Sequence, residues 1–215
     1  MFKRNPRSYL RVVAEFFYPR GGWYRAARYV IHRLRRLPDP AHRISRGIAA
    51  GVFASFTPFF GLHFLTAAIL SWAMRGNILA ALLATFVGNP LTFPLIAELS
   101  VNLGNAMLGQ PSDVHLPEIV ASFAGATSDL WANFRAAFTD DLADWTRFSR
   151  FMTRVFHPYL VGCIVPGILA GTVGYVLSNP LIHAYQRRRI KKLKARYEKR
   201  MAERLAEAGE IEKNK

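Results

Sequence analysis

Residues 47–74 read GIAAGVFASFTPFFGLHFLTAAILSWAM and contain no Asp, Glu, Lys or Arg. Residues 76–108 contain one such residue, Glu98, and residues 155–186 contain none. A helix needs about 20 apolar residues to cross a bilayer core of roughly 30 Å, and each of these stretches is longer than that. A helix that faces water along its length carries polar residues on one side. The sequence therefore predicts an all-α fold of the polytopic integral membrane class.

Proline and glycine interrupt each apolar stretch. Proline removes a backbone donor and moves the preceding residue out of helical geometry, and lipid cannot satisfy the carbonyls that are freed. The predicted helix breaks are Pro58, Gly61, Gly88, Pro90, Asn179 and Pro180. We expect short half-helices that meet at buried breaks, in part as re-entrant hairpins. Asn89 and Asn179 each precede a proline, so their side chains are expected to bond the carbonyls that these prolines free.

The charged residues lie mainly at the two ends of the chain. Of the 29 Lys and Arg residues, 24 lie in residues 1–46 and 187–215, and the whole chain carries only 14 Asp and Glu. Basic segments next to membrane spans stay on the cytoplasmic side. We therefore expect a multi-pass protein of the bacterial cytoplasmic (inner) membrane with both termini in the cytoplasm, and four crossings if residues 91–108 form their own span. The predicted organisation is a basic amphipathic N-terminal segment (1–46), a membrane domain (47–186) and a basic cytoplasmic tail (187–215).

Residues 22–37 form an amphipathic helix when they are plotted at 3.6 residues per turn. Such a helix, basic on one face and apolar with a tryptophan on the other, binds at the headgroup level of anionic bilayers. Packing on the protein's own spans fits the pattern equally well. The predicted lipid-interface residues are Trp23, Arg25, Arg28, Arg35 and Arg36.

The expected partners are membrane lipids, chiefly anionic ones. The basic tail has the charge for nucleic acid but carries no recognition motif, so nucleic acid is not an expected partner. A homo-oligomer is compatible with the sequence, which defines no protein partner.

Residues 111–154 form a polar insert between the second and third apolar stretches. Apolar side chains recur there at helical spacing from about Pro117 and predict an amphipathic helix that lies on the membrane or on the spans. They are Ile119, Val120, Phe123, Leu130, Trp131, Phe134 and Phe138. Acidic residues outnumber basic ones in the insert. This favours the side away from the cytoplasm, although acidic residues contribute little to topology.

The sequence contains no constellation that is typical of an enzyme. It has no Walker loop, no G-x-S-x-G elbow and no H-E-x-x-H pair. The six histidines are scattered, and the single cysteine, Cys163, excludes a disulfide framework. We therefore expect no catalytic activity, no cofactor and no metal site.

Polar residues inside the apolar stretches make up the candidate site. A charged or strongly polar residue at membrane depth is costly and is by default a functional hypothesis. The candidate polar membrane site consists of Thr57, His63, Asn89, Glu98 and Asn102. Glu98 and Asn102 share one helix face because they are four residues apart. The alternative is that Glu98 lies near a helix end against Arg75 and that His63 is a packing residue.

Four motifs give the chain a family resemblance. They are RGIAAGVF at residues 46–53, TPFFGLH at 57–63, RGN at 75–77 and GNPLT at 88–92. In order and spacing they resemble the bacterial membrane family catalogued as domain of unknown function 2062, over roughly residues 25–180. The resemblance implies an integral membrane protein, in some members fused to glycosyltransferase-like domains, and it implies no established activity.

Two classes of function fit these observations. The first is a small transporter or lipid-handling protein with a polar site at the helix breaks. The second is a non-catalytic membrane scaffold or anchor whose basic ends bind anionic lipid or cytoplasmic partners. Half-helices with polar breaks favour the first class, whereas small size and a single intramembrane acid favour the second.

Overall fold

A computed structural model describes residues 22–111, 114–139 and 142–213. Most of these residues are helical and the described ranges contain no strand, so the predicted all-α fold is confirmed. The helices are α2 (Gly22–Arg35), α3 (Ala41–Phe56), α4 (His63–Ala73), α5 (Ile78–Ala84), the 3-10 turn η1 (Thr85–Val87), α6 (Phe93–Met107), α7 (Leu116–Ala136), α8 (Thr146–Phe151), the π-helical turn η2 (Met152–Phe156), α9 (His157–Gly162) and α10 (Ile164–Lys213).

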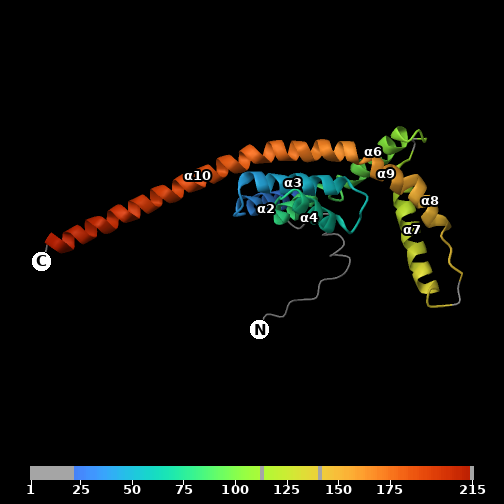
Figure 1. The fold of residues 1–215 in the computed structure, drawn as a ribbon, viewed down its shortest axis with the longest axis horizontal. Helices are drawn as coiled ribbons and strands as arrows, with labels where there is room; N and C mark the ends of the chain where they lie inside the picture. Colours follow the sequence, from blue (N-terminus) through green and yellow to red (C-terminus); the bar gives the residue numbers. More distant parts are fainter. Residues whose placement is uncertain (1–21, 112–113, 140–141, 214–215) are drawn as a thin grey trace.

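Helix α3 is the centre of the helical body. Figure 1 shows α10 running along α3 and continuing far beyond the body, while α7 and α8 form a hairpin at the opposite end. On one side α3 touches α5 at backbone distance. A Cβ on Gly47 would lie 2.2 Å from the carbonyl oxygen of Asn77, and one on Gly51 would lie 2.1 Å from that of Ala81. Small residues four apart allow this close approach, which is a common packing mode of helices in membranes.

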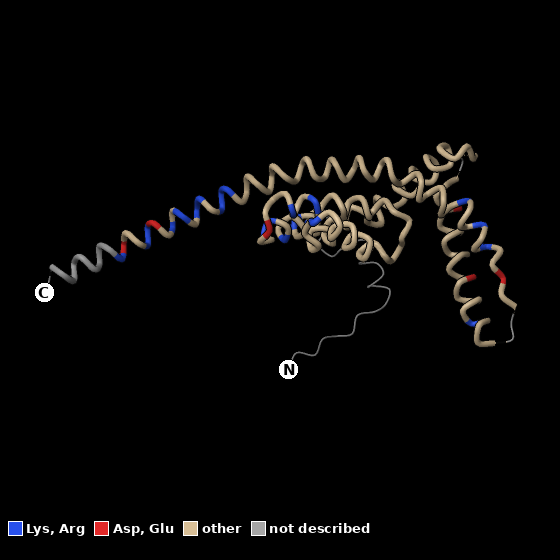
Figure 2. The backbone as a smooth tube through the Cα atoms, in the orientation of Figure 1, with Lys and Arg blue, Asp and Glu red and all other residues tan. Residues whose placement is uncertain are grey.

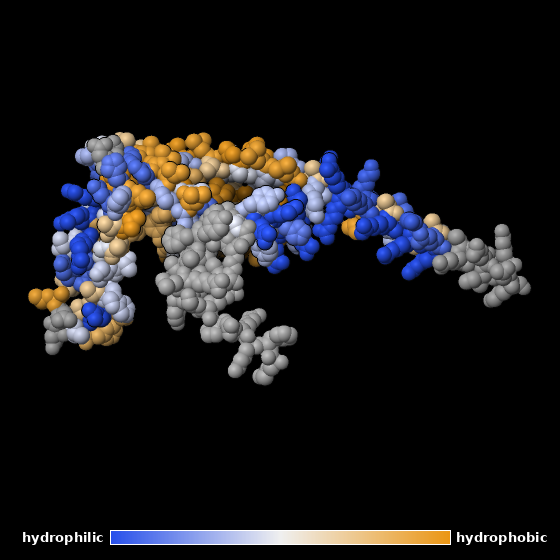
Figure 3. Space-filling view, turned by 180° about the vertical axis from the view of Figure 1, so that it is seen from behind, coloured by the Kyte–Doolittle hydropathy of each residue, from blue (hydrophilic) through white to orange (hydrophobic). Residues whose placement is uncertain are grey.

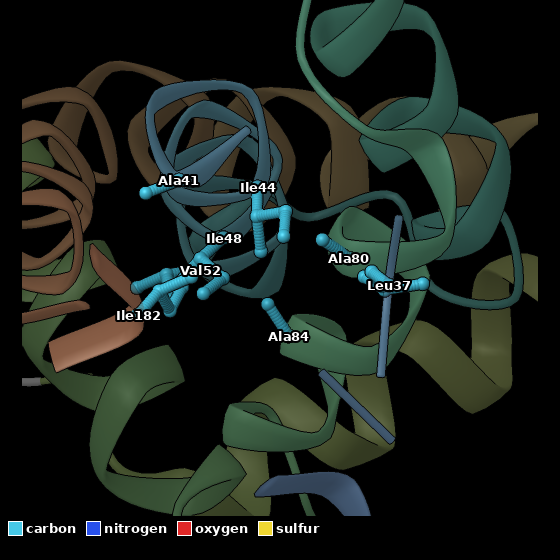
Figure 4. Packing of buried hydrophobic residues seen from close by; sticks show 8 residues of the cluster. All are labelled: Leu37, Ala41, Ile44, Ile48, Val52, Ala80, Ala84 and Ile182. Atoms are coloured by element: carbon cyan, nitrogen blue, oxygen red, sulfur yellow. The ribbon is translucent and has the colours of Figure 1, made fainter. Parts of the chain in front are cut away.

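The two larger of three clusters of buried apolar side chains account for most of the core. The first joins α3 to α5 and α10 (Figure 4) and consists of Leu37, Ala41, Ile44, Ile48, Val52, Ala80, Ala84 and Ile182. The second joins α6, α7, α8 and α9 and consists of Ala97, Val101, Ile119, Ala126, Phe151, Val155, Tyr159 and Cys163. The body therefore has one core around α3 and another around the α6–α9 crossing.

Two helix breaks lie where proline and glycine stand in the sequence. Helix α3 ends at Phe56, and Pro58 forces the preceding Thr57 into an extended conformation with φ −78° and ψ 149°. Gly61 then adopts φ +80°, which glycine reaches without strain, and α4 begins at His63. In the second break η1 ends at Val87, and α6 begins at Phe93 after the Gly88–Pro90 segment.

The predicted break at Asn179 and Pro180 is wrong, because α10 continues through Pro180 from Ile164 to Lys213. Contacts beyond the proline hold the helix in line. Ile182 is buried in the α3 cluster, and Gln186 Nε2 donates to the carbonyl oxygen of Asp39 at 2.9 Å. These tertiary contacts outweigh the one backbone hydrogen bond that the proline removes. The basic tail is thus the same helix as the third apolar stretch (Figure 2).

The apolar stretches at 47–74 and 76–108 do not form single long helices. They are divided among α3, α4, α5 and α6, which have 16, 11, 7 and 15 residues. Among the described residues, one continuous helical run, Thr146–Arg204, is long and apolar enough to cross a membrane. Its most apolar window has a mean hydropathy of 2.0 and is 22% buried inside the protein. The fold therefore supports membrane association through one helix, and within the described ranges no second helix has this length and composition.

The two amphipathic helices predicted from sequence are both present. In α2, Leu34 packs against the α3 cluster while Arg25, Arg28 and Arg35 are exposed, as is Arg36 just after the helix. The side chain of Trp23, which the sequence also predicts at the lipid interface, lies outside the part of the chain whose side chains the structure describes. Helix α7 begins at Leu116, next to the predicted Pro117. Its apolar residues lie in two environments: Ile119 and Phe123 join the α6–α9 core, whereas Leu130, Trp131 and Phe134 are exposed, as is Phe138 just after the helix.

Candidate functional site

The five residues of the predicted polar site do not converge on one cavity. Thr57 is 4% exposed, and its Oγ1 donates to the carbonyl oxygen of Ala54 at 2.7 Å. This bond gives a carbonyl oxygen at the end of α3 a side-chain donor. The Thr57 hydroxyl is therefore hydrogen-bonded within its own turn.

Asn89 also bonds its own loop. Its Nδ2 donates to the carbonyl oxygens of Phe86 at 3.3 Å and Val87 at 3.5 Å. Its Oδ1 accepts from the backbone N–H groups of Leu91 at 2.9 Å and Thr92 at 3.1 Å. The hydroxyl of Thr92 donates to Val87 as well. The side chain of Asn89 therefore satisfies carbonyls before Pro90, as the sequence predicted for it, and in addition binds N–H groups of the turn that precedes α6.

Asn102 and Glu98 connect α6 to the segment that precedes α7. Asn102 makes a two-bond clamp on Val114, donating from Nδ2 to its carbonyl oxygen and accepting from its N–H, both at 3.2 Å. Glu98 Oε1 lies 3.6 Å from His115 Nδ1, with the two side chains 41% and 73% exposed. The sequence also suggested that Glu98 packs against Arg75, but in the structure its partner is His115. Both residues therefore join one helix to the following segment.

An aromatic cluster fills the first helix break next to His63. The ring of Phe60 lies 5.6 Å from the imidazole of His63, 4.6 Å from Phe93, 4.4 Å from Phe123 and 6.0 Å from Tyr159, always edge to face. Edge-to-face pairs at these distances are favourable beyond the area they bury. His63 thus lies beside an apolar aromatic cluster, and among the described residues no group of polar side chains converges at this break.

A groove of about 480 Å³ lies between α3, α4 and α10. Its floor is the Ala49–Ala50 part of α3, and its walls are single faces of α4 and α10. It is lined by Arg46, Ala49, Ala50, Phe53, Leu70, Met74, Gly167, Ile168, Gly171, Thr172 and Tyr175. Arg46 is the one charged residue of this lining. The groove could not be predicted from the sequence, because its three sides come from distant parts of the chain.

A polar cluster around Asp39 lies where α10 leaves the body. Arg43 Nη1 donates to Asp39 Oδ1 at 3.1 Å, and the Asn77 side chain donates to Asp39 Oδ2. Asn77 Oδ1 accepts from the N–H of Ala80 at 2.7 Å and so caps α5. Gln186 of α10 donates to the Asp39 backbone. The cap signal, an asparagine after glycine and before an apolar run, was readable from sequence, whereas the partners of Asp39 were not.

A second polar clamp holds the α7–α8 hairpin. Asp129, 1% exposed, pairs with Arg147 Nε at 2.7 Å and accepts from the N–H of Phe148 at 2.9 Å. One turn later, Asn133 Nδ2 donates to the Asp144 carbonyl oxygen at 2.7 Å, and Oδ1 accepts from the Asp144 N–H at 2.9 Å. Hydrogen bonds from Thr146 lower the pKa of the Asp144 carboxyl below its ordinary value.

The family comparison covers most of the chain. A family described as "Uncharacterized protein conserved in bacteria (DUF2062)" matches residues 24–191. These residues include α2 to α9, the groove, the Asp39 cluster and the apolar part of α10. No curated protein and no solved structure matches the chain. The match extends from the first amphipathic helix into the basic part of α10, and the chain belongs to the bacterial DUF2062 family.

Proposed function

We propose that this chain is an integral protein of the bacterial cytoplasmic membrane that handles membrane lipid. The observation that carries the proposal is the band of large apolar side chains that the body exposes (Figure 3). Large apolar side chains that are more than half exposed lie on α4, α5, α6 and α10 and include Phe64, Leu65, Trp72, Leu79, Leu95, Leu177 and Leu181. A monomer in water rarely exposes so continuous an apolar surface, whereas a lipid environment solvates it.

The distribution of charge agrees with this location. Figure 2 shows Lys and Arg around α2, the start of α3 and the distal part of α10, while the proximal part of α10 has none. Basic groups of this kind stay with cytoplasmic headgroups. We propose that the chain enters the membrane as the α3–α4 hairpin, crosses through the broken α5–α6 segment and returns through α10. Both termini then lie in the cytoplasm.

The α7–α8 hairpin fits the opposite membrane surface. It lies at the end of the body remote from the basic tail and runs across the direction of α10 (Figure 1). Its exposed face carries Trp131, Phe134 and Phe138, which are 62%, 58% and 77% exposed. Aromatic side chains of an amphipathic helix favour the level of the headgroups.

Lipid handling is favoured over transport of a polar solute because of what fills the breaks. The polar side chains of Thr57 and Asn89 are bonded to their own backbone, and Phe60 and its aromatic neighbours occupy the first break. A polar solute would need converging donors and acceptors. The groove beside α3 is instead apolar along most of its length.

Membrane insertion is tested by extraction and labelling. Membranes that contain the chain should retain it in alkaline carbonate and in 1 M salt and release it in detergent. In a Cys163→Ala background, single cysteines placed at Arg25 and Lys192 should react with an impermeant maleimide only after the cells are opened. A cysteine placed at Phe138 should react in intact cells. Release by salt alone, or labelling of Lys192→Cys in intact cells, would contradict the proposed location.

Lipid handling is tested in vesicles that contain the purified chain. Fluorescent phospholipid in the inner leaflet should become accessible to dithionite faster than in protein-free vesicles. The second candidate function, a scaffold, is favoured by one observation: α10 beyond Arg187 has exposed side chains as far as Arg204. An inserted protein that leaves the rate of lipid movement unchanged would favour the scaffold.

A further inference from the structure

We propose that the groove between α3, α4 and α10 holds one acyl chain of an anionic phospholipid, and that the lipid phosphate pairs with Arg46. The inference deepens the proposed function and rests on the membrane location. The groove has about 480 Å³, which is within the range of specific small-molecule sites, about 300–1,000 Å³.

The groove is apolar along its length and charged at one end. Ala49 and Ala50 form a shallow floor because their side chains are small, and Ile168 and Leu70 stand on opposite walls. Gly171 lets α10 approach α3 closely: a Cβ there would lie 3.0 Å from the Ala49 carbonyl oxygen. A chain of methylene groups matches such a surface, whereas a polar ligand would leave its donors and acceptors without partners.

Arg46 is held in place at the charged end of the groove. Its Nη1 donates to the carbonyl oxygen of Met74 at 3.0 Å, and its Nε lies 3.4 Å from the carbonyl oxygen of His42. These two contacts use two of the five N–H donors of a guanidinium. Among the residues that the structure describes, no carboxylate pairs with Arg46, whereas nearby Arg43 is paired with Asp39. Arg46 therefore keeps its charge and free donors for a ligand.

A phospholipid has a charged phosphate followed by apolar chains, and this order matches the charged end of the groove followed by its apolar length. The charged end of the groove is formed by the first turns of α3, next to the Asp39 cluster and to the basic part of α10. The groove follows α10 from Tyr175 back to Gly167, away from this basic end. A lipid of the cytoplasmic leaflet has its phosphate at the basic level and its chains directed inward. Guanidinium groups bind phosphate oxygens with paired hydrogen bonds.

Native mass spectrometry of the full-length chain in mild detergent tests the inference. The probes are phosphatidylglycerol and phosphatidylcholine with identical acyl chains. We expect one phosphatidylglycerol per chain, retained about tenfold better than phosphatidylcholine because of the charged hydrogen bonds. Arg46→Gln should remove this preference, and Arg46→Lys should restore most of it. Arg200→Gln, which removes an exposed cation on α10 more than three turns beyond Gln186, should leave the preference unchanged.

A second pair of variants tests the acyl-chain part without touching Arg46. Ile168→Trp places a larger side chain in the groove and should abolish retention of both lipids. Leu169→Trp is the matched control, because the next residue of α10 is similarly exposed, at 61% against 54%, and does not line the groove. Circular dichroism and melting of each variant establish that it is folded before its lipid is counted.

Five results would overturn the inference. Equal retention of the two lipids, or equal losses in Arg46→Gln and Arg200→Gln, would refute the pairing with Arg46. Unchanged retention in Ile168→Trp, or a dimer mass that replaces the lipid-bound monomer, would refute the acyl chain in the groove. Displacement of phosphatidylglycerol by inorganic phosphate is the fifth, because the phosphate alone would then account for binding. Carbonate extraction of the same variants separates the two proposals: an inserted protein without lipid refutes only the groove, and an extracted protein refutes the membrane location.

Discussion

The side-chain amide of Asn89 donates to the carbonyl oxygen of Phe86 at 3.3 Å. In a continuous α-helix this carbonyl would accept from the N–H of residue 90, four positions later, but residue 90 is proline and has no N–H. The amide next to the proline therefore replaces the backbone donor that the proline lacks. This bond, together with the bonds that Asn89 Oδ1 accepts from Leu91 and Thr92, stabilises the turn between the two helices.

Asn89→Leu should destabilise the folded protein by about 1–3 kcal/mol, because the Phe86 carbonyl loses its side-chain donor and the N–H groups of Leu91 and Thr92 lose the Asn89 oxygen. The measurement is thermal melting in detergent with the yield of folded protein. Asn179→Leu is the matched control: the same Asn-Pro-Leu motif lies inside α10, and no hydrogen bond of the Asn179 side chain occurs among the described residues. Equal losses in the two variants would contradict the role of the Asn89 amide.

The crossing of α6 and α9 should be intolerant of a single methyl group. A Cβ on Gly104 would lie 1.8 Å from the carbonyl oxygen of Pro158, and one on Gly162 would lie 1.9 Å from that of Ser100. Gly104→Ala and Gly162→Ala should each cost about 1–3 kcal/mol or more, because the backbones must separate. Gly174→Ala is the control, because its nearest atom would be 3.5 Å away. A melting temperature for Gly104→Ala equal to that of the control would refute the close crossing.

Two of the three predicted helix breaks are present in the structure, and a physical difference separates them from the third. At Pro58 the chain also has Gly61, which adopts φ +80° and reverses direction. At Pro90 it has Gly88 and the side chain of Asn89, which bonds the backbone of the turn before α6. At Pro180 neither a neighbouring glycine nor a cap is present, and α10 packs against the body on the far side of the proline. Proline alone is thus a weaker stop signal than proline with the residues of a turn.

The groove and its arginine could not be predicted, because they depend on helix contacts between residues far apart in the sequence. In the sequence, Arg46 is one of many basic residues of the N-terminal segment. In the fold, the Met74 carbonyl oxygen at the end of α4 lies beside it. Conversely, Asn102 was a candidate for a buried polar site because of its apolar neighbours, but its partner is the backbone of Val114. The sequence identifies polar residues in apolar stretches, and only the fold shows which partner each one has.

Asp129→Ala should release the α8 side of the hairpin from α7. The carboxylate is buried and holds Arg147 and the N–H of Phe148, so its loss should cost about 1–3 kcal/mol. Ser128→Ala, at the exposed neighbouring position, is the control. Limited proteolysis with trypsin should cleave after Arg147 faster in Asp129→Ala than in the parent or in Ser128→Ala. Equal cleavage rates in all three proteins would contradict the clamp.

Glu98→Gln should leave the folded protein almost unchanged. The Glu98 and His115 side chains are 3.6 Å apart and both substantially exposed, and an exposed pair of this kind contributes at most about 1 kcal/mol. The variant should melt within that margin of the parent in detergent and move lipid at the same rate in vesicles. Asn102→Leu, one turn along α6, should lose more stability because it removes both bonds to the Val114 backbone. A folded Glu98→Gln protein that moves no lipid would instead make the carboxylate part of the functional site and revive the polar site predicted from the sequence.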